Sequence, residues 1–106
     1  MLLRGKKLGV LLSSSPSQPG FQHGLLLSQT ALAAGVHVYL YCIDEAVRGL
    51  EDPRLQEMAA QGLKLFACAF SADQRRLPRS PRAIFSGLAA LSDLMASTDR
   101  FVSFNA

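Results

Sequence analysis

Short apolar runs of strand length alternate with helical segments along this chain. The runs cover residues 7–12, 36–43, 63–67 and 101–104, and the second is rich in β-branched and aromatic residues, as expected of a strand that is covered on both faces. Strand–helix–strand units are right-handed crossovers, which produce a parallel sheet with helices on both faces. The sequence therefore predicts an α/β fold, a three-layer α/β/α sandwich around a mostly parallel sheet of four to five strands.

The first two helices are predicted from their ends. The first spans residues 21–34, and Gly35 is suited to the left-handed turn that ends a helix. Gly24, Leu27, Ala31 and Ala34 fall on one face of it. The second begins at Asp52-Pro53, a capping carboxylate before a proline at the first helical position, and ends at Gly62.

A third helix is predicted from a second capping pattern, Ser80-Pro81. Apolar residues then recur at helical spacing on one side: Ile84, Leu88, Leu91 and Met95. In this interpretation a loop and one helix, with no further strand, connect the third strand to the last one.

Length and composition indicate one domain, residues 1–106, with enough apolar residues (49%) to fold without a metal or a disulfide. The formal charge of +3 is scattered except for the arginines between Arg75 and Arg82, so no nucleic-acid partner is expected. Two widely separated cysteines fit a reducing compartment. The N-terminus lacks a signal peptide's apolar region and no stretch is long enough to span a membrane, so we expect a cytoplasmic protein with no membrane association.

Cys68 is the residue that we expect to carry chemistry. It follows the third strand, and ligands and active sites of parallel sheets gather at the carboxyl ends of the strands. Arg75 and Arg76 lie in the following loop, and cationic neighbours favour the thiolate, which is the nucleophilic form of cysteine. The alternative is that Cys68 is a small apolar residue of the core and is unreactive.

Cys42 closes the second strand, and we expect it to be structural. Asp44 and Glu45 follow it, and acidic neighbours disfavour a thiolate. Whether Cys42 can reach Cys68 depends on strand order. Adjacent parallel strands lie about 4.8 Å apart, which is within reach of a disulfide, whereas an intervening strand would keep the two cysteines apart.

The loop of residues 13–20 lies where doubly wound folds hold the phosphates of nucleotides and flavins. It contains neither glycine-rich phosphate motif, and Pro16 and Pro19 each lack the backbone N–H that a phosphate would use. A connecting loop is therefore favoured over a cofactor site. Because no metal-ligand spacing, carboxylate pair or catalytic triad stands out, neither a metal nor a cofactor is expected.

Several segments have an order that matches a known family. They are the opening strand 8–12, the stretch 27–41, Leu65-Phe-Ala-Cys68, and residues 85–94 through 99–104. The most specific part is the closing one, in which Ser86-Gly87-Leu88 precedes a small-residue helix, followed by Asp99-Arg100 and a last strand. Together these segments resemble the DsrE/DsrF-like family, which includes the TusD-type sulfur-relay subunits.

The resemblance implies a single DsrE-like domain that works in a trimer or hexamer, homomeric or mixed with related subunits. It implies sulfur transfer between a protein donor and a protein acceptor, with Cys68 as the catalytic residue that carries sulfur as a persulfide. Arg75 and Arg76 resemble a basic pair that follows the cysteine in some members, which implies anion binding. Two alternatives stay open: a non-catalytic structural subunit of such an oligomer, and a small nucleotide- or flavin-binding domain.

Overall fold

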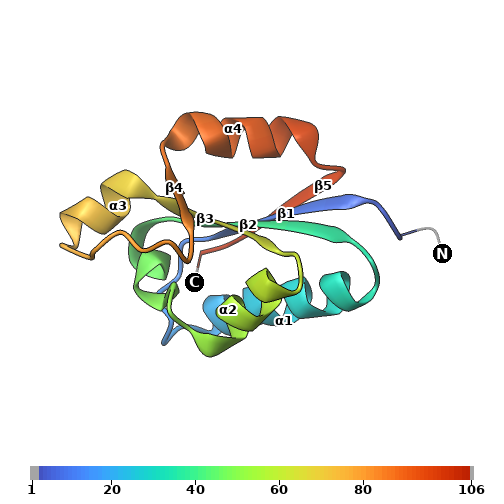
Figure 1. The fold of residues 1–106 in the computed structure, drawn as a ribbon, viewed down its shortest axis with the longest axis horizontal. Coiled ribbons are helices and arrows are strands. Elements are labelled where there is room, and N and C mark those ends of the chain that lie inside the picture. Colours follow the sequence, from blue (N-terminus) through green and yellow to red (C-terminus); the bar gives the residue numbers. More distant parts are fainter. Residues whose placement is uncertain (1–2, 106) are drawn as a thin grey trace.

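The computed structural model describes residues 3–105 and shows a five-stranded, all-parallel sheet between layers of helices (Figure 1). The strands are β1 (Lys7–Leu12), β2 (His37–Cys42), β3 (Lys64–Cys68), β4 (Ile84–Ser86) and β5 (Arg100–Phe104). The helices are α1 (Pro19–Ala33), α2 (Pro53–Ala60), α3 (Ala69–Gln74) and α4 (Leu88–Ser97), with a 3-10 helix, η1 (Asp44–Gly49). The predicted α/β/α fold with a parallel sheet is confirmed.

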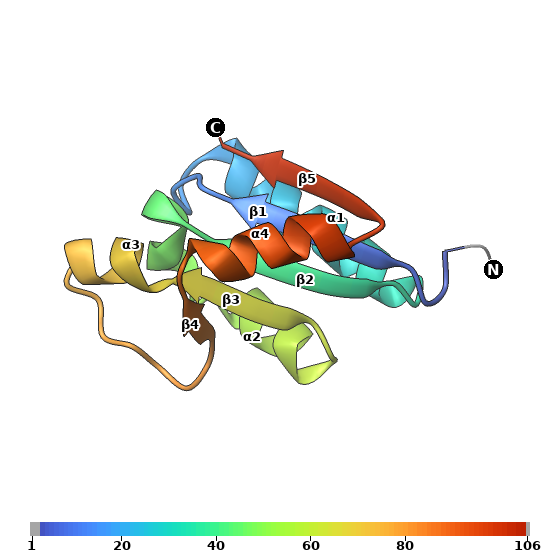
Figure 2. The ribbon, with the colours of Figure 1, turned by 90° about the horizontal axis from the view of Figure 1, so that it is seen from above.

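The direction of each crossover explains which face each helix covers. The sheet order is β4-β3-β2-β1-β5, so the chain steps one way from β1 to β4 and then returns across the whole sheet to β5. Helices α1 and α2 cover one face, and α4, on the return crossover, covers the other (Figures 1 and 2). Right-handed crossovers that run in opposite directions place their helices on opposite faces. Helix α3 lies beyond the carboxyl edge of the sheet, beside η1.

The two faces of the sheet are buried to different extents. The α1/α2 face holds the main core, in which fully buried residues include Val10, Leu12, Phe21, Leu40 and Leu55. The α4 face has a small cluster of buried residues, Tyr41, Cys68 and Leu94. Leu94 is the only buried residue of α4, whereas Leu88 and Met95 are 60% and 56% exposed. Helix α4 is therefore a thin cover over the face that contains Cys68.

The prediction that a helix begins at Ser80-Pro81 is wrong. Residues Ile84–Ser86 pair with β3 as a short edge strand, and α4 begins only after Gly87. Ser80 forms a local turn instead, in which its hydroxyl accepts the Arg82 N–H at 3.1 Å. The prediction fails because Ile84 belongs to a strand, although it continues the apolar spacing of the helix that follows.

The end of the first helix and the start of the second are confirmed, whereas α1 begins at Pro19, before the predicted residue 21. Gly35 follows α1 with a φ of +84°, which is the left-handed turn that the sequence indicated. Asp52 caps α2, since its Oδ1 accepts the Arg54 N–H at 2.9 Å. The buried face of α1 is shifted from the predicted one: it contains Gly24 but runs through Phe21 and Leu25 rather than Leu27.

Candidate functional site

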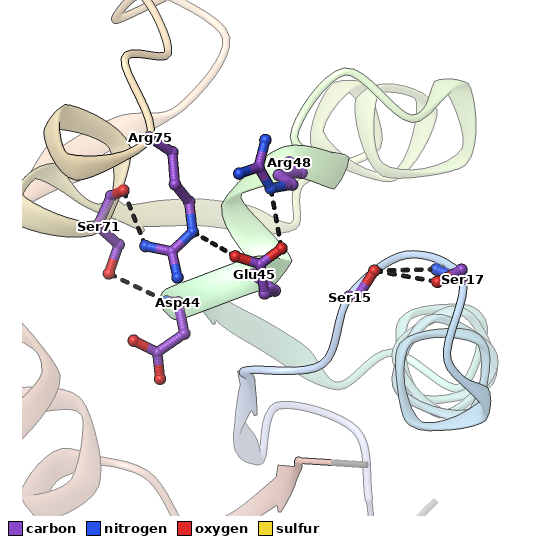
Figure 3. Close-up of polar contacts among 7 residues, drawn as sticks. All are labelled: Ser15, Ser17, Asp44, Glu45, Arg48, Ser71 and Arg75. Atoms are coloured by element: carbon purple, nitrogen blue, oxygen red, sulfur yellow. Dashed lines mark hydrogen bonds and ion pairs between the residues drawn. The ribbon is translucent and has the colours of Figure 1, made fainter.

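The connections at the carboxyl edge of the sheet are tied to one another, as expected for parallel strands. Ile43 donates its N–H to the Leu12 carbonyl at 2.9 Å, immediately after β2. The next residue, Asp44, donates its N–H to the Ser71 hydroxyl at 3.0 Å, which joins η1 to α3 (Figure 3). The segments that follow β2 and β3 therefore form one hydrogen-bonded unit around the end of β3.

Cys68 is the last residue of β3 and also the N-cap of α3. Its sulfur accepts the Ser71 N–H at 3.4 Å. Cys68 is only 3% exposed, in the cluster that it shares with Tyr41 and Leu94 under α4. The sequence placed Cys68 correctly at the strand end, but it lies inside the protein and not on an open surface.

Tyr41 holds the turn between β4 and α4 close to Cys68. Its buried hydroxyl donates to the carbonyl oxygens of Ser86 at 3.3 Å and Gly87 at 3.1 Å. Burial is the largest cause that raises the pKa of Tyr41, and the adjacent Cys68 side chain raises it further. The phenol is therefore a protonated donor at neutral pH. Sequence reasoning missed Tyr41, although a tyrosine in a buried strand signals a hydroxyl that needs a partner.

Ser86 lies directly beside Cys68 on the neighbouring strand. The two residues are register partners in the parallel pairing of β3 and β4, so their side chains project from the same face of the sheet. The Ser86 hydroxyl oxygen is buried and has no hydrogen-bond partner among residues 3–105. Sequence reasoning also missed Ser86, because it placed this segment on a helix.

The two arginines predicted to bind an anion have different surroundings, and Figure 3 shows those of Arg75. Arg75 pairs its Nε with Glu45 at 2.7 Å and donates from Nη1 to the Ser71 carbonyl at 3.2 Å. Hydrogen bonds from Arg75 and then from Arg48 hold the pKa of Glu45 below its ordinary value. Arg76 is exposed at a φ of +56° and pairs with no carboxylate in the described part of the chain. Arg75 thus anchors α3 to η1, and Arg76 faces solvent.

Cys42 and Cys68 are both free thiols, although β2 and β3 are neighbours in the sheet. Cys42 is the register partner of Ala67, so it lies in the main core on the α1/α2 face, whereas Cys68 lies on the α4 face. Burial raises the pKa of Cys42 from 9.0 to about 12. Cys42 is therefore a buried core residue that is protonated at neutral pH.

The loop before α1 is bound to the sheet. Ser13 donates its N–H to the Phe104 carbonyl at 3.0 Å, and the hydroxyls of Ser15 and Ser17 lie 3.1 Å apart (Figure 3). Pro19 occupies the first turn of α1, where it supplies no N–H to a ligand. Between residues 3 and 105 no group of three His, Cys, Asp or Glu side chains gathers as a metal site would require. Over the same range, every helix is too short or too polar to cross a membrane.

Comparison with known proteins identifies the family. The profile of the DsrE/DsrF-like family matches residues 6–104. Among solved structures, the YchN protein from E. coli has a similar fold, with a TM-score of 0.77 and 19% sequence identity over 94% of this chain and 99% of that chain. No curated protein matches the sequence at a significant level. Because the family match spans nearly the whole chain and includes every strand of the sheet, the protein belongs to the DsrE/DsrF-like family.

Proposed function

We propose that this protein is a sulfur carrier that accepts sulfur on Cys68 and passes it on as a persulfide. One observation carries the proposal: in a member of a family generally related to sulfur relay, Cys68 ends β3 at the carboxyl edge of the sheet. The free state of both cysteines supports a reducing compartment, and we propose the cytoplasm.

The proposed reaction needs no cofactor. The Cys68 thiolate attacks the outer, sulfane sulfur of a donor persulfide, R–S–SH. A new S–S bond forms on Cys68, the donor S–S bond breaks, and the donor leaves as its thiolate, R–S⁻. Attack by an acceptor thiolate on the outer sulfur of the Cys68 persulfide reverses these roles and regenerates the Cys68 thiolate. No net oxidation occurs in either step.

Loading requires the cover over Cys68 to move, because this residue is 3% exposed. Several features support such a movement. Strand β4 has three residues and pairs only with β3, and α4 buries only Leu94. Gly87, between them, has open space around its α-carbon. The β4–α4 turn is therefore the part of the site that we propose to open for the donor.

Arg75 and Arg76 have separate roles in this proposal. Arg75 positions α3, and with it Cys68, through its pair with Glu45 and its bond to the Ser71 carbonyl. Arg76 is exposed and is available to an anionic group of the donor or acceptor protein. In this proposal Arg75 has a structural role and Arg76 contacts the partner protein.

A pair of matched variants tests the function. After incubation with a small persulfide donor, intact-mass spectrometry should show a gain of one sulfur atom in the wild type and in Cys42→Ser, but none in Cys68→Ser. Equal loading of the two variants would refute the assignment to Cys68. Alkylation of the native protein with and without the donor shows in parallel whether the thiol becomes accessible.

A second candidate is a non-catalytic structural subunit, which the burial of Cys68 favours. We propose that the protein assembles in either case, with copies of itself or with related subunits, as a trimer or hexamer. Large apolar side chains are exposed around the Cys68 end of the sheet and on α4, namely Phe70, Ile84, Leu88 and Met95. Light scattering of the purified protein measures the assembly, and absence of sulfur loading in an assembled wild type would favour the structural candidate.

A further inference from the structure

We infer that Ser86 is a second residue of the Cys68 site and donates a hydrogen bond from its hydroxyl to the sulfur anion held on Cys68. The inference rests on the proposed sulfur-carrier function. It assigns the ligand of this hydroxyl to a chemical class, the anionic terminal sulfur of a persulfide.

The strand register brings the two groups together. Cys68 and Ser86 are partners across β3 and β4, and adjacent parallel strands are about 4.8 Å apart. Register partners project from the same face of the sheet, so the pairing of β3 with β4 makes the Ser86 hydroxyl and the Cys68 thiol neighbours. Flexibility of a long side chain is not needed for the contact, because both side chains are short.

The Ser86 hydroxyl is also a buried polar group that the described part of the fold leaves without a hydrogen bond. Its oxygen is buried without a hydrogen-bond partner in the described chain, although most buried polar groups in folded proteins are paired. A buried, unpaired hydroxyl lowers stability compared with an apolar side chain of the same size. Such a group is explained if its partner is the sulfur added to Cys68 during function.

The position of Ser86 is fixed by Tyr41. The Tyr41 hydroxyl donates to the carbonyls of Ser86 and Gly87, which holds the end of β4 against the sheet. Tyr41 directs its proton to these carbonyls, whereas the Ser86 hydroxyl donates to no partner within residues 3–105. Tyr41 is thus a positioning residue, and Ser86 is the group that touches the ligand.

The environment makes this donor necessary. With 3% of Cys68 exposed, water can supply little hydrogen bonding to its sulfur in the closed site. The Ser71 N–H already donates to the inner sulfur at 3.4 Å. An anionic outer sulfur that enters this site needs a further donor, and hydrogen bonds to charged groups are roughly twice as strong as neutral ones.

Removal of the hydroxyl tests the inference. We expect Ser86→Ala to lose the persulfide about ten-fold faster than the wild type, since it lacks a charge-assisted hydrogen bond. The probe is a small persulfide donor, and the loaded fraction is followed over time by intact-mass spectrometry after the donor is removed. Ser86→Thr, which keeps a hydroxyl and suits a strand, should restore the wild-type lifetime. Ser103→Ala, at an exposed serine of edge strand β5, is the control and should change nothing.

Thermal unfolding separates this role from a structural one. Because the hydroxyl is unpaired, Ser86→Ala should unfold at the same temperature as the unloaded wild type or at a higher one. If Ser86→Ala unfolds at a lower temperature than the wild type and Ser86→Thr unfolds at the wild-type temperature, the role of the hydroxyl is structural and the inference is overturned. Unchanged sulfur lifetime in Ser86→Ala would overturn it as well while leaving the proposed function intact. A wild type that takes up no sulfur refutes both.

Discussion

The backbone N–H of Ser71 donates to the sulfur of Cys68 at 3.4 Å, at the point where β3 becomes α3. The same serine accepts the Asp44 N–H with its hydroxyl and an Arg75 N–H with its carbonyl. All three polar groups of Ser71 are therefore used, and it is 2% exposed. Cys68 is oriented by a residue that is itself fixed from the segment after β2.

Ser71→Ala should destabilise the protein without abolishing sulfur loading. The substitution removes the acceptor of the Asp44 N–H and leaves that donor unpaired, which costs about 1–2 kcal/mol of unfolding free energy. The backbone N–H that donates to Cys68 is retained, so Cys68 can still be loaded. Urea unfolding measures the first effect and intact mass the second. An unchanged urea midpoint would show that the Ser71–Asp44 bond does not stabilise the fold.

Tyr41→Phe should increase the access of reagents to Cys68. It removes the hydrogen bonds to the Ser86 and Gly87 carbonyls and keeps the ring that stacks on Phe66 at a centroid distance of 6.4 Å. The β4–α4 turn then opens more often, and we expect the alkylation rate of Cys68 to rise about ten-fold, the equivalent of one hydrogen bond. The rate is measured by mass spectrometry of iodoacetamide-treated native protein, with Cys42→Ser as background.

Tyr39→Phe is the matched control, since Tyr39 lies on the same strand and packs near the same cluster. It should leave the alkylation rate unchanged. If Tyr41→Phe and Tyr39→Phe give equal rates, the turn is held by packing and not by the Tyr41 hydroxyl.

The sequence predicted the sheet well because long apolar runs and strong helix ends leave few alternatives. β1 has the predicted bounds, and Gly35 and Asp52 end and begin helices as their chemistry requires. The short elements were not predictable in this way. η1 and α3 have six residues each and β4 has three, which is too few for a periodic pattern to appear.

The candidate site was predicted in position but not in its surroundings. That Cys68 ends a strand follows from local pattern, whereas its burial depends on where α4 crosses the sheet, which no local signal records. The partnership with Ser86 depends on the pairing of β3 with β4, a contact between segments distant in sequence. Likewise, the ion pair of Arg75 with Glu45 joins the end of α3 to η1, two segments that are 30 residues apart in the sequence.

Arg75→Gln and Arg76→Gln should differ in their effect on stability. Arg75 is 17% exposed and contacts both Glu45 and Ser71, so its loss should lower the unfolding free energy by about 1 kcal/mol. Arg76 makes no ion pair within residues 3–105, and its substitution should be neutral in the isolated protein. Urea unfolding of both variants measures this difference. Equal losses would show that Arg75 does not anchor α3.

Stability at alkaline pH should report on Cys42. Burial raises its pKa from 9.0 to about 12, so the folded protein keeps the thiol proton over a range in which the unfolded chain releases it. Ionisation then favours the unfolded state: the stabilising effect is complete below pH 9.0 and is lost as the pH rises to about 12. By pH about 10.5 the loss should be ~2 kcal/mol, and at the end of the range ~4 kcal/mol.

Cys42→Ala isolates this contribution from other groups that ionise at high pH. The variant should be less stable than the wild type near neutral pH, because it leaves a small cavity in the main core. That deficit should shrink as the pH rises, since only the wild type has a thiol at this position whose ionisation favours the unfolded state. Urea unfolding of both proteins at several pH values measures the difference in unfolding free energy. A deficit that stays constant up to pH about 10.5 would show that the Cys42 thiol ionises equally in the folded and unfolded states.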